Sequence, residues 1–144
     1  MQVFIPSASC LQTARQLDRV RLNKQIREAG QLLKAIDYQG KGWHNHPATR
    51  MYRPHKKWLI CYQECLKAFF EGRMNDAESW DKKAEKISPN FLTEELCTQH
   101  RRRLYTKNPV KYAEFSAYGT SEENWYVVDG VKLVYINGKQ IRQA

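Results

Sequence analysis

Residues 11–36 read LQTARQLDRVRLNKQIREAGQLLKAI, and this stretch predicts one long amphipathic helix. Its apolar residues recur at intervals of four, three, four and three, the spacing of a stripe along one helix face; they are Leu22, Ile26, Ala29, Leu33 and Ile36. The flanks of this stripe are basic and carry Arg15, Arg19, Arg21, Lys24 and Arg27. A core-facing helix with a cationic flank is therefore the first predicted element.

The middle of the chain predicts a second strong helix, from about Pro54 to Glu71, with Gly72 as its terminator. Its apolar residues fall on one face; they are Trp58, Leu59, Tyr62, Cys65, Leu66 and Phe69. Residues 74–89 favour a short helix closed by a Ser-Pro pair. Between the first two helices, residues 37–47 predict a loop with two glycines, one tryptophan and two histidines.

A third helix is predicted over about residues 92–105, and Asn108 with Pro109 favours the cap and first turn of a short fourth helix. Near the N-terminus, residues 2–5 (QVFI) precede Pro6 and favour an extended arm. After this arm, Ser7 or Ser9 is suited to cap the first helix.

After residue 124 the pattern changes to β-rich runs separated by Asp-Gly and Asn-Gly, the dipeptides that favour tight hairpin turns. The sequence thus predicts a mainly α fold, a compact bundle of three to four helices with a short N-terminal extended arm and a small C-terminal β-hairpin or meander. We expect a single domain, residues 1–144, with a helical core at about 7–118 and a β-segment at about 124–142.

The composition favours a polyanionic partner. Lys and Arg number 24 against 15 acidic residues, for a formal net charge of +9, and an apolar fraction of 42% excludes a disordered chain. Nucleic acid is the leading partner and an anionic membrane the second, but no apolar run approaches the roughly 20 residues of a membrane span. Without a signal-peptide pattern the protein is expected in the cytoplasm, and four cysteines without a Cys-x-x-Cys pair are expected to be reduced, buried or inert thiols.

Basic residues gather in three places, which fit a duplex groove if folding brings them to one face. The first is the flank of the first predicted helix, the second surrounds the start of the next, and the third lies near residue 100; the residues outside the first helix are Arg50, Arg53, Lys56, Lys57, Arg101, Arg102, Arg103, Lys107 and Lys111. The alternative is a solvated basic surface without a partner. For Arg101–Arg103, a favourable interaction with a helix dipole is the simplest explanation.

Glu28 is a carboxylate among cations: Arg21 and Lys24 lie on the same helix flank, seven and four residues away, favour its ionised form and keep it a hydrogen-bond acceptor or a stabiliser of positive charge. An ordinary surface ion pair is the alternative, and Asp18 is a weaker carboxylate candidate. His46 is expected either to fix its loop by hydrogen bonding or to face a phosphate. Trp43 is read as a core anchor, with a wedge against bases as the alternative.

No metal site is predicted, because the spacings of the histidines and cysteines match no common zinc frame. No cofactor is expected. The chain also lacks a glycine-rich phosphate loop, a serine-elbow motif and paired carboxylates at a recognisable spacing, so the common hydrolase, kinase and dehydrogenase classes have no support.

The chain resembles the endonuclease V-like family of pyrimidine-dimer DNA glycosylases, in particular its bacterial and phage branch. The resembling segments are LD (17–18) with RVRLNKQ (19–25), IREAGQLLKAI (26–36), GWHNHPATRMYR (42–53) and QHRRRLYTKNPVKYAEF (99–115). The most specific is GWHNHPATRMYR. The C-terminal β-segment lies outside the resemblance.

The resemblance implies a mostly helical enzyme that grips duplex DNA and flips a nucleotide out. We expect a monomer in the cytoplasm, or in the host cytoplasm for a phage protein. Such an enzyme would cleave the glycosidic bond with an amine nucleophile and a glutamate, and would act as an AP lyase. The glutamate falls on Glu28 and the amine on the N-terminus, at Met1; nucleic-acid contacts are implied or expected for Arg21, Lys24, Arg27, His46, Arg50, Arg53, Arg101, Arg102, Arg103 and Lys107.

Two features distinguish this chain from the best-known member of the family. Gln2 is bulky where that enzyme exposes the amine of a small residue, so Met1 is expected to be retained. The segment before Glu28 is several residues longer, so the sequence leaves open whether the amine and the carboxylate meet. The alternative functions are a non-catalytic nucleic-acid-binding module derived from such an enzyme and a basic adaptor for a protein partner.

Overall fold

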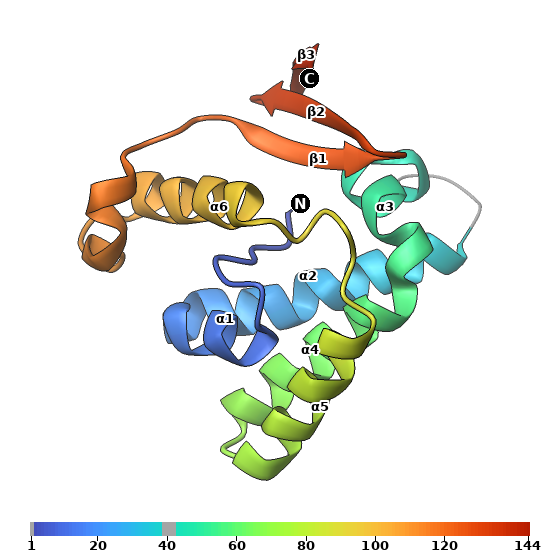
Figure 1. Cartoon of the computed structure of the whole chain (residues 1–144), viewed down its shortest axis with the longest axis vertical. Helices are drawn as coiled ribbons and strands as arrows, with labels where there is room; N and C mark the ends of the chain where they lie inside the picture. The colour runs from blue at the N-terminus through green and yellow to red at the C-terminus, as the bar shows by residue number, and fades with distance from the viewer. Residues whose placement is uncertain (1, 39–42) are drawn as a thin grey trace.

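The computed structural model describes residues 2–38 and 43–144, and in these residues six α-helices precede a three-stranded antiparallel sheet (Figure 1). The helices are α1 Cys10–Gln16, α2 Arg19–Asp37, α3 Pro47–Tyr52, α4 Lys56–Phe70, α5 Met74–Lys86 and α6 Glu94–Lys107. The strands are β1 Asn124–Val128, β2 Val131–Ile136 and β3 Lys139–Gln143. The predicted mainly α fold with a C-terminal β-meander is confirmed, although the helices outnumber the three to four expected.

The single long helix predicted over residues 11–36 is wrong, because α1 and α2 are separated at Leu17 and Asp18, which both have extended backbone. The Asp18 carboxylate caps α2 by accepting a hydrogen bond from the backbone N–H of Arg21 (3.1 Å). Such a cap satisfies one of the free amides of a helix start and stabilises the helix by about 1 kcal/mol. Ser9 caps α1, as one of the two predicted alternatives.

The helix predicted from Pro54 to Glu71 starts two residues later, at Lys56, because its first two residues belong to a 3-10 turn; a separate short helix and another 3-10 turn lie before it. α3 starts at Pro47, where His46 Nδ1 accepts a hydrogen bond from the Ala48 N–H (3.0 Å). The turns are η1 Trp43–Asn45 and η2 Arg53–His55. Gly72, with a φ of 77°, terminates α4 as predicted. The predicted loop overlaps residues 39–42, which lie outside the described residues.

The third predicted helix is α6, displaced by about two residues and capped by the Thr93 hydroxyl. α5 spans 13 residues and lies within residues 74–89, where a helix closed by a Ser-Pro pair was expected. The predicted fourth α-helix is instead a turn followed by the 3-10 helix η3, Ala113–Tyr118. Asn108 still caps this turn, since its side-chain oxygen accepts from the Lys111 N–H (3.1 Å).

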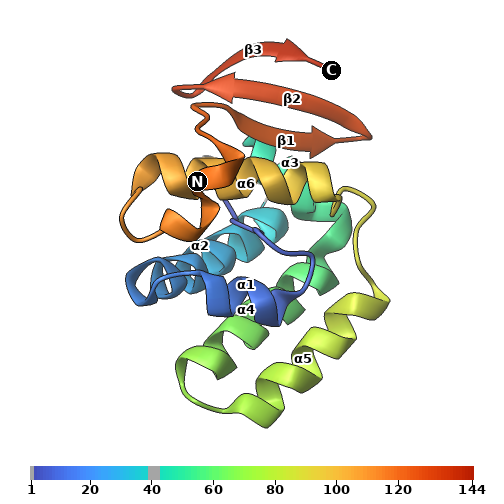
Figure 2. The ribbon, with the colours of Figure 1, turned by 60° about the vertical axis from the view of Figure 1, so that its left-hand side comes forward.

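The sheet follows the predicted hairpin turns. Asp129 and Gly130 connect β1 to β2, and Asn137 and Gly138 connect β2 to β3, all four with φ between 51° and 77°. Two consecutive residues with positive φ form the mirror-image turn that suits the twist of a hairpin. Figure 2 shows the sheet lying over α6 and α3, with β3 farthest from the helices and exposed along its length.

The N-terminal arm runs between α2 and α6 (Figure 1), and its residues Val3, Phe4 and Ile5 are buried in one hydrophobic cluster that reaches from α1 to the sheet. The extended arm predicted from the sequence is thereby confirmed. All four cysteines are free and buried, as expected. Across residues 2–38 and 43–144, none of the helices has the length and apolar character needed to cross a membrane.

Candidate functional site

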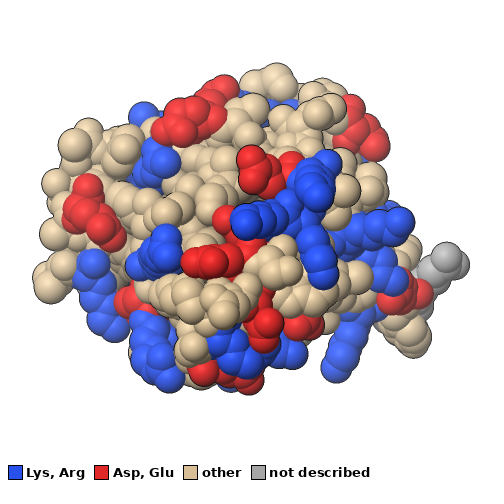
Figure 3. Space-filling model, turned by 60° about the horizontal axis from the view of Figure 1, so that its bottom comes forward, with Lys and Arg blue, Asp and Glu red and all other residues tan. Residues whose placement is uncertain are grey.

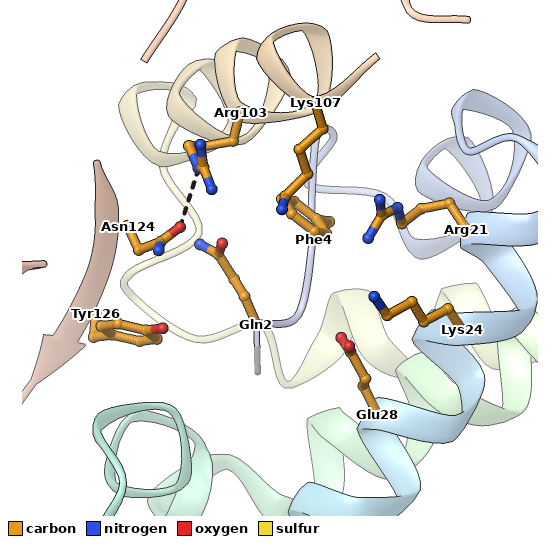
Figure 4. A pocket seen from close by; sticks show the side chains of 9 residues that line it. All are labelled: Gln2, Phe4, Arg21, Lys24, Glu28, Arg103, Lys107, Asn124 and Tyr126. Carbon is orange, nitrogen blue, oxygen red and sulfur yellow. Dashed lines mark hydrogen bonds between the residues drawn. The ribbon is translucent and has the colours of Figure 1, made fainter. Parts of the chain in front are cut away.

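The arm, α2, α6 and β1 enclose a pocket of about 160 Å³ (Figure 4). Its lining residues are Gln2, Phe4, Arg21, Lys24, Glu28, Arg103, Lys107, Asn124 and Tyr126. Arg21, Lys24 and Glu28 face it together because residues four and seven apart share one helix face. Five of the residues predicted to bind nucleic acid or to catalyse therefore meet in one place, although they come from two helices far apart in sequence.

The pocket is strongly cationic. Four basic residues line it with one carboxylate, that of Glu28. Burial and the charge of Arg103 lower the pKa of the Lys107 ammonium, and the two cations of α2 lower it further, whereas Glu28 acts in the opposite direction. An excess of positive charge in a concave site attracts an anion such as a phosphate group.

Glu28 is held by the neighbouring side chain of Gln25, one helical turn earlier. Gln25 Nε2 donates to Glu28 Oε2 (2.9 Å) and also to the carbonyl oxygen of Gln2 (3.1 Å). Residue 2 of the arm and the candidate catalytic carboxylate are thus joined through one amide group. The sequence left open whether the N-terminal region meets Glu28, and the structure brings Gln2 into the same pocket; Met1 lies outside the described residues.

The wall opposite α2 is built from α6 and β1. Arg103 Nε donates to Asn124 Oδ1 (3.1 Å), and its Nη1 donates to the Ser121 carbonyl oxygen (3.0 Å), so this buried arginine ties the sheet to α6. Tyr126 completes the wall, and burial raises the pKa of its phenol to about 12, which keeps it neutral. The ring of His46 meets that of Tyr126 edge to face, with centroids 5.7 Å apart.

A second hollow continues from the pocket along the same cationic surface. It shares Arg21, Lys24 and Lys107 with the first and adds Asp18, Val20, Asn108, Lys111 and Tyr112. Together the two hollows form a basic groove, a name we keep for the residues that line either hollow. The groove offers positive charge on both α2 and α6, which suits a phosphate backbone.

Asp18, the weaker carboxylate candidate, has structural partners in this groove. Its carboxylate accepts from the Tyr112 hydroxyl, and Lys111 Nζ lies 3.6 Å from its Oδ1. Although burial opposes ionisation, the hydrogen bonds from Tyr112 and the Arg21 backbone and the charge of Lys111 lower the pKa of Asp18. The group therefore stays ionised as a helix cap.

His46 does not line the pocket, and its hydrogen-bonding alternative is the one observed. Its Nδ1 accepts from Ala48, so the neutral ring carries its proton on Nε2, and burial lowers its pKa to about 4. Its ring packs against Trp43, with centroids 4.6 Å apart. Trp43 itself is 47% exposed, so the core-anchor interpretation of this residue is wrong.

The other basic candidates do not reach the pocket. Arg27 and Arg50 are exposed on α2 and α3. Arg53 donates to the carbonyl oxygen of His44, which commits its guanidinium to the segment before α3. DNA contact by these three residues stays a prediction.

The three consecutive arginines of α6 diverge, because neighbouring residues point about 100° apart around a helix. Arg103 alone lines the pocket. Arg101 Nη1 lies 2.6 Å from Glu94 Oε1, and Arg102 Nε donates to the Tyr118 carbonyl oxygen (2.8 Å). Two of the three are thus held by partners within the protein, and their contact with DNA also stays a prediction.

Sequence reasoning missed Gln2, Phe4, Gln25, Asn124 and Tyr126. Gln25 carries a usable signal, since it is a polar residue between Leu22 and Ala29 on the apolar face of the helix. The others depend on how the arm and the sheet pack on α6, which no local pattern indicates. Among the described residues there is also no group of three or more metal-binding side chains.

Not every basic region of the surface resembles the groove. Figure 3, with the α4 and α5 end of Figure 1 turned forward, shows acidic and basic side chains interspersed. Ion pairs after α4 are of this kind, since Arg73 lies 2.6 Å from Glu71 and 2.8 Å from Asp76. Charges of opposite sign side by side cancel at a distance, so this face is less suited to a polyanion.

Comparison with known proteins gives one family. A sequence model of the family described as pyrimidine dimer DNA glycosylase matches residues 1–82, more than half of the chain, whereas no curated protein and no solved structure matches. The matched part holds the arm, Arg21, Lys24 and Glu28, while the opposite wall of the pocket lies beyond it. The chain therefore belongs to the pyrimidine dimer DNA glycosylase family, whose name implies an enzyme that acts on DNA.

Proposed function

We propose that this protein excises a damaged base of the pyrimidine-dimer type from duplex DNA and then nicks the strand as an AP lyase. An amine at the N-terminus is the nucleophile, and Glu28 is the acid–base and electrostatic group. The observation that carries the proposal is the pocket in which Gln2 and Glu28 are bridged by Gln25 and surrounded by cations.

The nucleophile suits the chemistry. An α-amine has a reference pKa of about 8, so a useful fraction is neutral at pH 7. Its lone pair attacks C1′ of the deoxyribose; the C1′–N bond breaks, and the base leaves with that electron pair and takes up a proton. The attached amine loses a proton, and its lone pair then expels the ring oxygen: the C1′–O4′ bond breaks, O4′ takes up a proton, and the covalent iminium forms between C1′ and the nitrogen. The ionised carboxylate of Glu28 stabilises the positive charge on the sugar and accepts a proton.

Strand nicking follows from the same iminium. Loss of a proton from C2′ allows the C3′–O bond to break, and the 3′ phosphate leaves with the bonding electrons. Water then hydrolyses the imine and frees the amine. Glu28 lies in the same pocket and serves as the base for the C2′ proton.

The basic groove supplies the DNA contacts of this proposal. Arg21, Lys24 and Lys107 line both of its hollows, so phosphates on either side of the reacting nucleotide meet positive charge. A sugar carbon inside a stacked duplex cannot reach a concave pocket, so the nucleotide must flip out, at an unstacking cost of a few kcal/mol. A damaged base stacks less well, which lowers that cost and favours the damaged site.

Borohydride trapping tests the proposal, because borohydride reduces the iminium to a stable secondary amine. We expect an adduct with an abasic duplex, seen in the intact mass, and base release from a dimer-containing duplex. Glu28→Gln is expected to retain DNA binding and lose turnover, whereas Glu85→Gln, an exposed residue of α5, is the matched control. No adduct and no base release would refute catalysis and favour the binding module.

Peptide mapping of the adduct shows which amine is the nucleophile, the α-amine of the N-terminus or the side-chain amine of Lys107. Modification of the N-terminal peptide supports the α-amine. Modification of Lys107, which lines the pocket and whose pKa is lowered, would refute the assignment of the nucleophile but retain the lyase reaction.

A further inference from the structure

Gln25 is a polar side chain with no exposed surface in the middle of α2. We infer that it is a positioning residue that holds the N-terminal arm and Glu28 in one fixed relation, so that the amine and the carboxylate act on the same sugar. The inference rests on the proposed function and adds to it a residue that touches neither DNA nor the reacting atoms.

The nitrogen of the Gln25 amide joins the two groups. Its two hydrogens are donated to Glu28 Oε2 (2.9 Å) and to the carbonyl oxygen of Gln2 (3.1 Å). Both acceptors line or adjoin the pocket in Figure 4, where the Glu28 carboxylate and the side chain of Gln2 point into the same space. A shift of either group therefore strains the bond to the other.

The oxygen of the same amide holds the arm two residues farther on, at Phe4. Gln25 Oε1 accepts from the Phe4 N–H (2.8 Å), and the Tyr62 hydroxyl, which donates to the Phe4 carbonyl oxygen (2.8 Å), lies 3.3 Å from it. His100 Nδ1 accepts from the next backbone amide, that of Ile5 (2.8 Å). The arm is thus fixed by side chains of α2, α4 and α6, all of them buried.

The orientation of the Gln25 amide is determined by these partners. A flipped amide would point NH₂ at the Phe4 N–H and an oxygen at both Glu28 and the Gln2 carbonyl, which replaces attraction with repulsion at every bond. A buried and fully bonded amide has one orientation, so it transmits a defined geometry.

Two substitutions separate the two halves of the amide. Gln25→Glu keeps an oxygen for the Phe4 N–H but replaces the donor to Glu28 by a second carboxylate. Gln25→Met keeps a side chain of similar length but removes both the hydrogen-bond donor and the acceptor of the amide. Gln99 offers a matched control, since it is equally buried and donates from Nε2 to Ser121 Oγ (2.9 Å) and to the Glu123 carbonyl oxygen (2.7 Å), away from Glu28.

The experiment measures three quantities for each variant: DNA affinity, the single-turnover rate of borohydride-trappable adduct formation against pH, and hydrogen exchange of the Phe4 amide without DNA. We expect both Gln25 variants to form adduct about 10- to 100-fold more slowly with unchanged affinity, since small misplacements of reacting groups have effects of this size. Gln25→Glu should also move the acidic limb of the profile to higher pH, because two adjacent carboxylates share a proton.

Phe4 exchange should accelerate in Gln25→Met and stay slow in Gln25→Glu, and Gln99→Met should change neither exchange nor adduct rate. An adduct rate in folded Gln25→Met or Gln25→Glu equal to that of the parent would overturn the inference. If Gln25→Met does not fold, the rate and pH profile of Gln25→Glu decide alone. Absence of adduct in the parent protein refutes the proposed function instead. In that case, an unchanged hydrogen-exchange rate of the Phe4 amide in Gln25→Met would refute, independently, that Gln25 holds the N-terminal arm.

Discussion

Acid should destabilise this protein in part through His100, a buried histidine of α6. Its side chain is 1% exposed, and Nδ1 accepts the hydrogen bond from the Ile5 N–H. Burial and the nearby charge of Arg103 lower its pKa from an ordinary value of 6.5 to about 3. The folded protein thus binds this proton far less readily than the unfolded chain does.

The sign and size of the change in the free energy of unfolding follow from the difference in the pKa of His100 between the folded and the unfolded chain. The contribution of neutral His100 to the free energy of unfolding is complete above the unfolded pKa of 6.5 and is lost as the pH falls towards about 3. For one such group, lowering the pH from 7 to 5 reduces the free energy of unfolding by about 2 kcal/mol. The same figure results if the folded pKa is about 4, because pH 5 lies above both values.

Urea unfolding of the parent and of His100→Asn at the two pH values measures this quantity. The asparagine side chain can still accept from Ile5 but does not titrate. We expect the variant to be less stable at pH 7, where the smaller side chain leaves a cavity, yet to lose about 2 kcal/mol less on acidification. His46 titrates in both proteins and cancels in the comparison. Equal losses in parent and variant would refute the argument.

Three further predictions concern the groove, a cap and the core. The first variant neutralises the three basic residues shared by both hollows: Arg21→Gln, Lys24→Gln, Lys107→Gln. It should make the negative slope of log K for DNA binding against log salt concentration shallower, by about 0.9 per lost phosphate contact. The pair Lys82→Gln and Lys86→Gln on α5 should leave the slope unchanged, and an equal effect would contradict the assignment of the groove. Asp18→Ala should reduce the free energy of unfolding by about 1–2 kcal/mol and Asp18→Asn by less, since asparagine still caps a helix, and equal losses would argue against the cap. Leu32→Ala, fully buried on α2, should cost about 3–5 kcal/mol in urea unfolding, and a loss below 1 kcal/mol would show that the site is not close-packed.

The fold was predictable where local patterns determine it. The hairpin turns at Asp129 and Asn137 need only a residue pair with positive φ, and the apolar stripe of α2 needs only its spacing. The break before α2 was missed because the apolar stripe begins only at Leu22, so its spacing says nothing about whether a helix continues through Leu17 and Asp18. α1 has seven residues and depends on a distant partner, since the Asp81 carboxylate accepts from Ser9 Oγ (3.1 Å) and from the Leu11 N–H (3.2 Å).

The site, like the fold, was predictable only where a local pattern determines it. Spacing on one helix was enough to group Arg21, Lys24 and Glu28, and the cluster of basic residues near residue 100 pointed to the C-terminal end of α6. The expectation that Arg101–Arg103 act together neglects the angle between consecutive helix residues, and an ion pair with Glu94 already engages the first of them. Gln2 and Tyr126 reach the pocket only through contacts between the two ends of the chain.

The boundary of the family match at residue 82 runs through the pocket and separates two kinds of contribution. The matched side holds Gln25, Glu28 and the arm, which are the groups of the proposed chemistry. The other side is supplied by Arg103, Lys107, Asn124 and the neutral phenol of Tyr126, which line the pocket with two cations, an amide and an aromatic face; the proposed mechanism assigns the nucleophile and the general base to neither the cations nor the phenol. On the proposed mechanism, the reaction type is therefore determined by the first half of the chain. On the same mechanism we expect the wall built by α6 and β1 to select the damaged base, so that substitutions there change which lesion is excised without abolishing adduct formation with an abasic site.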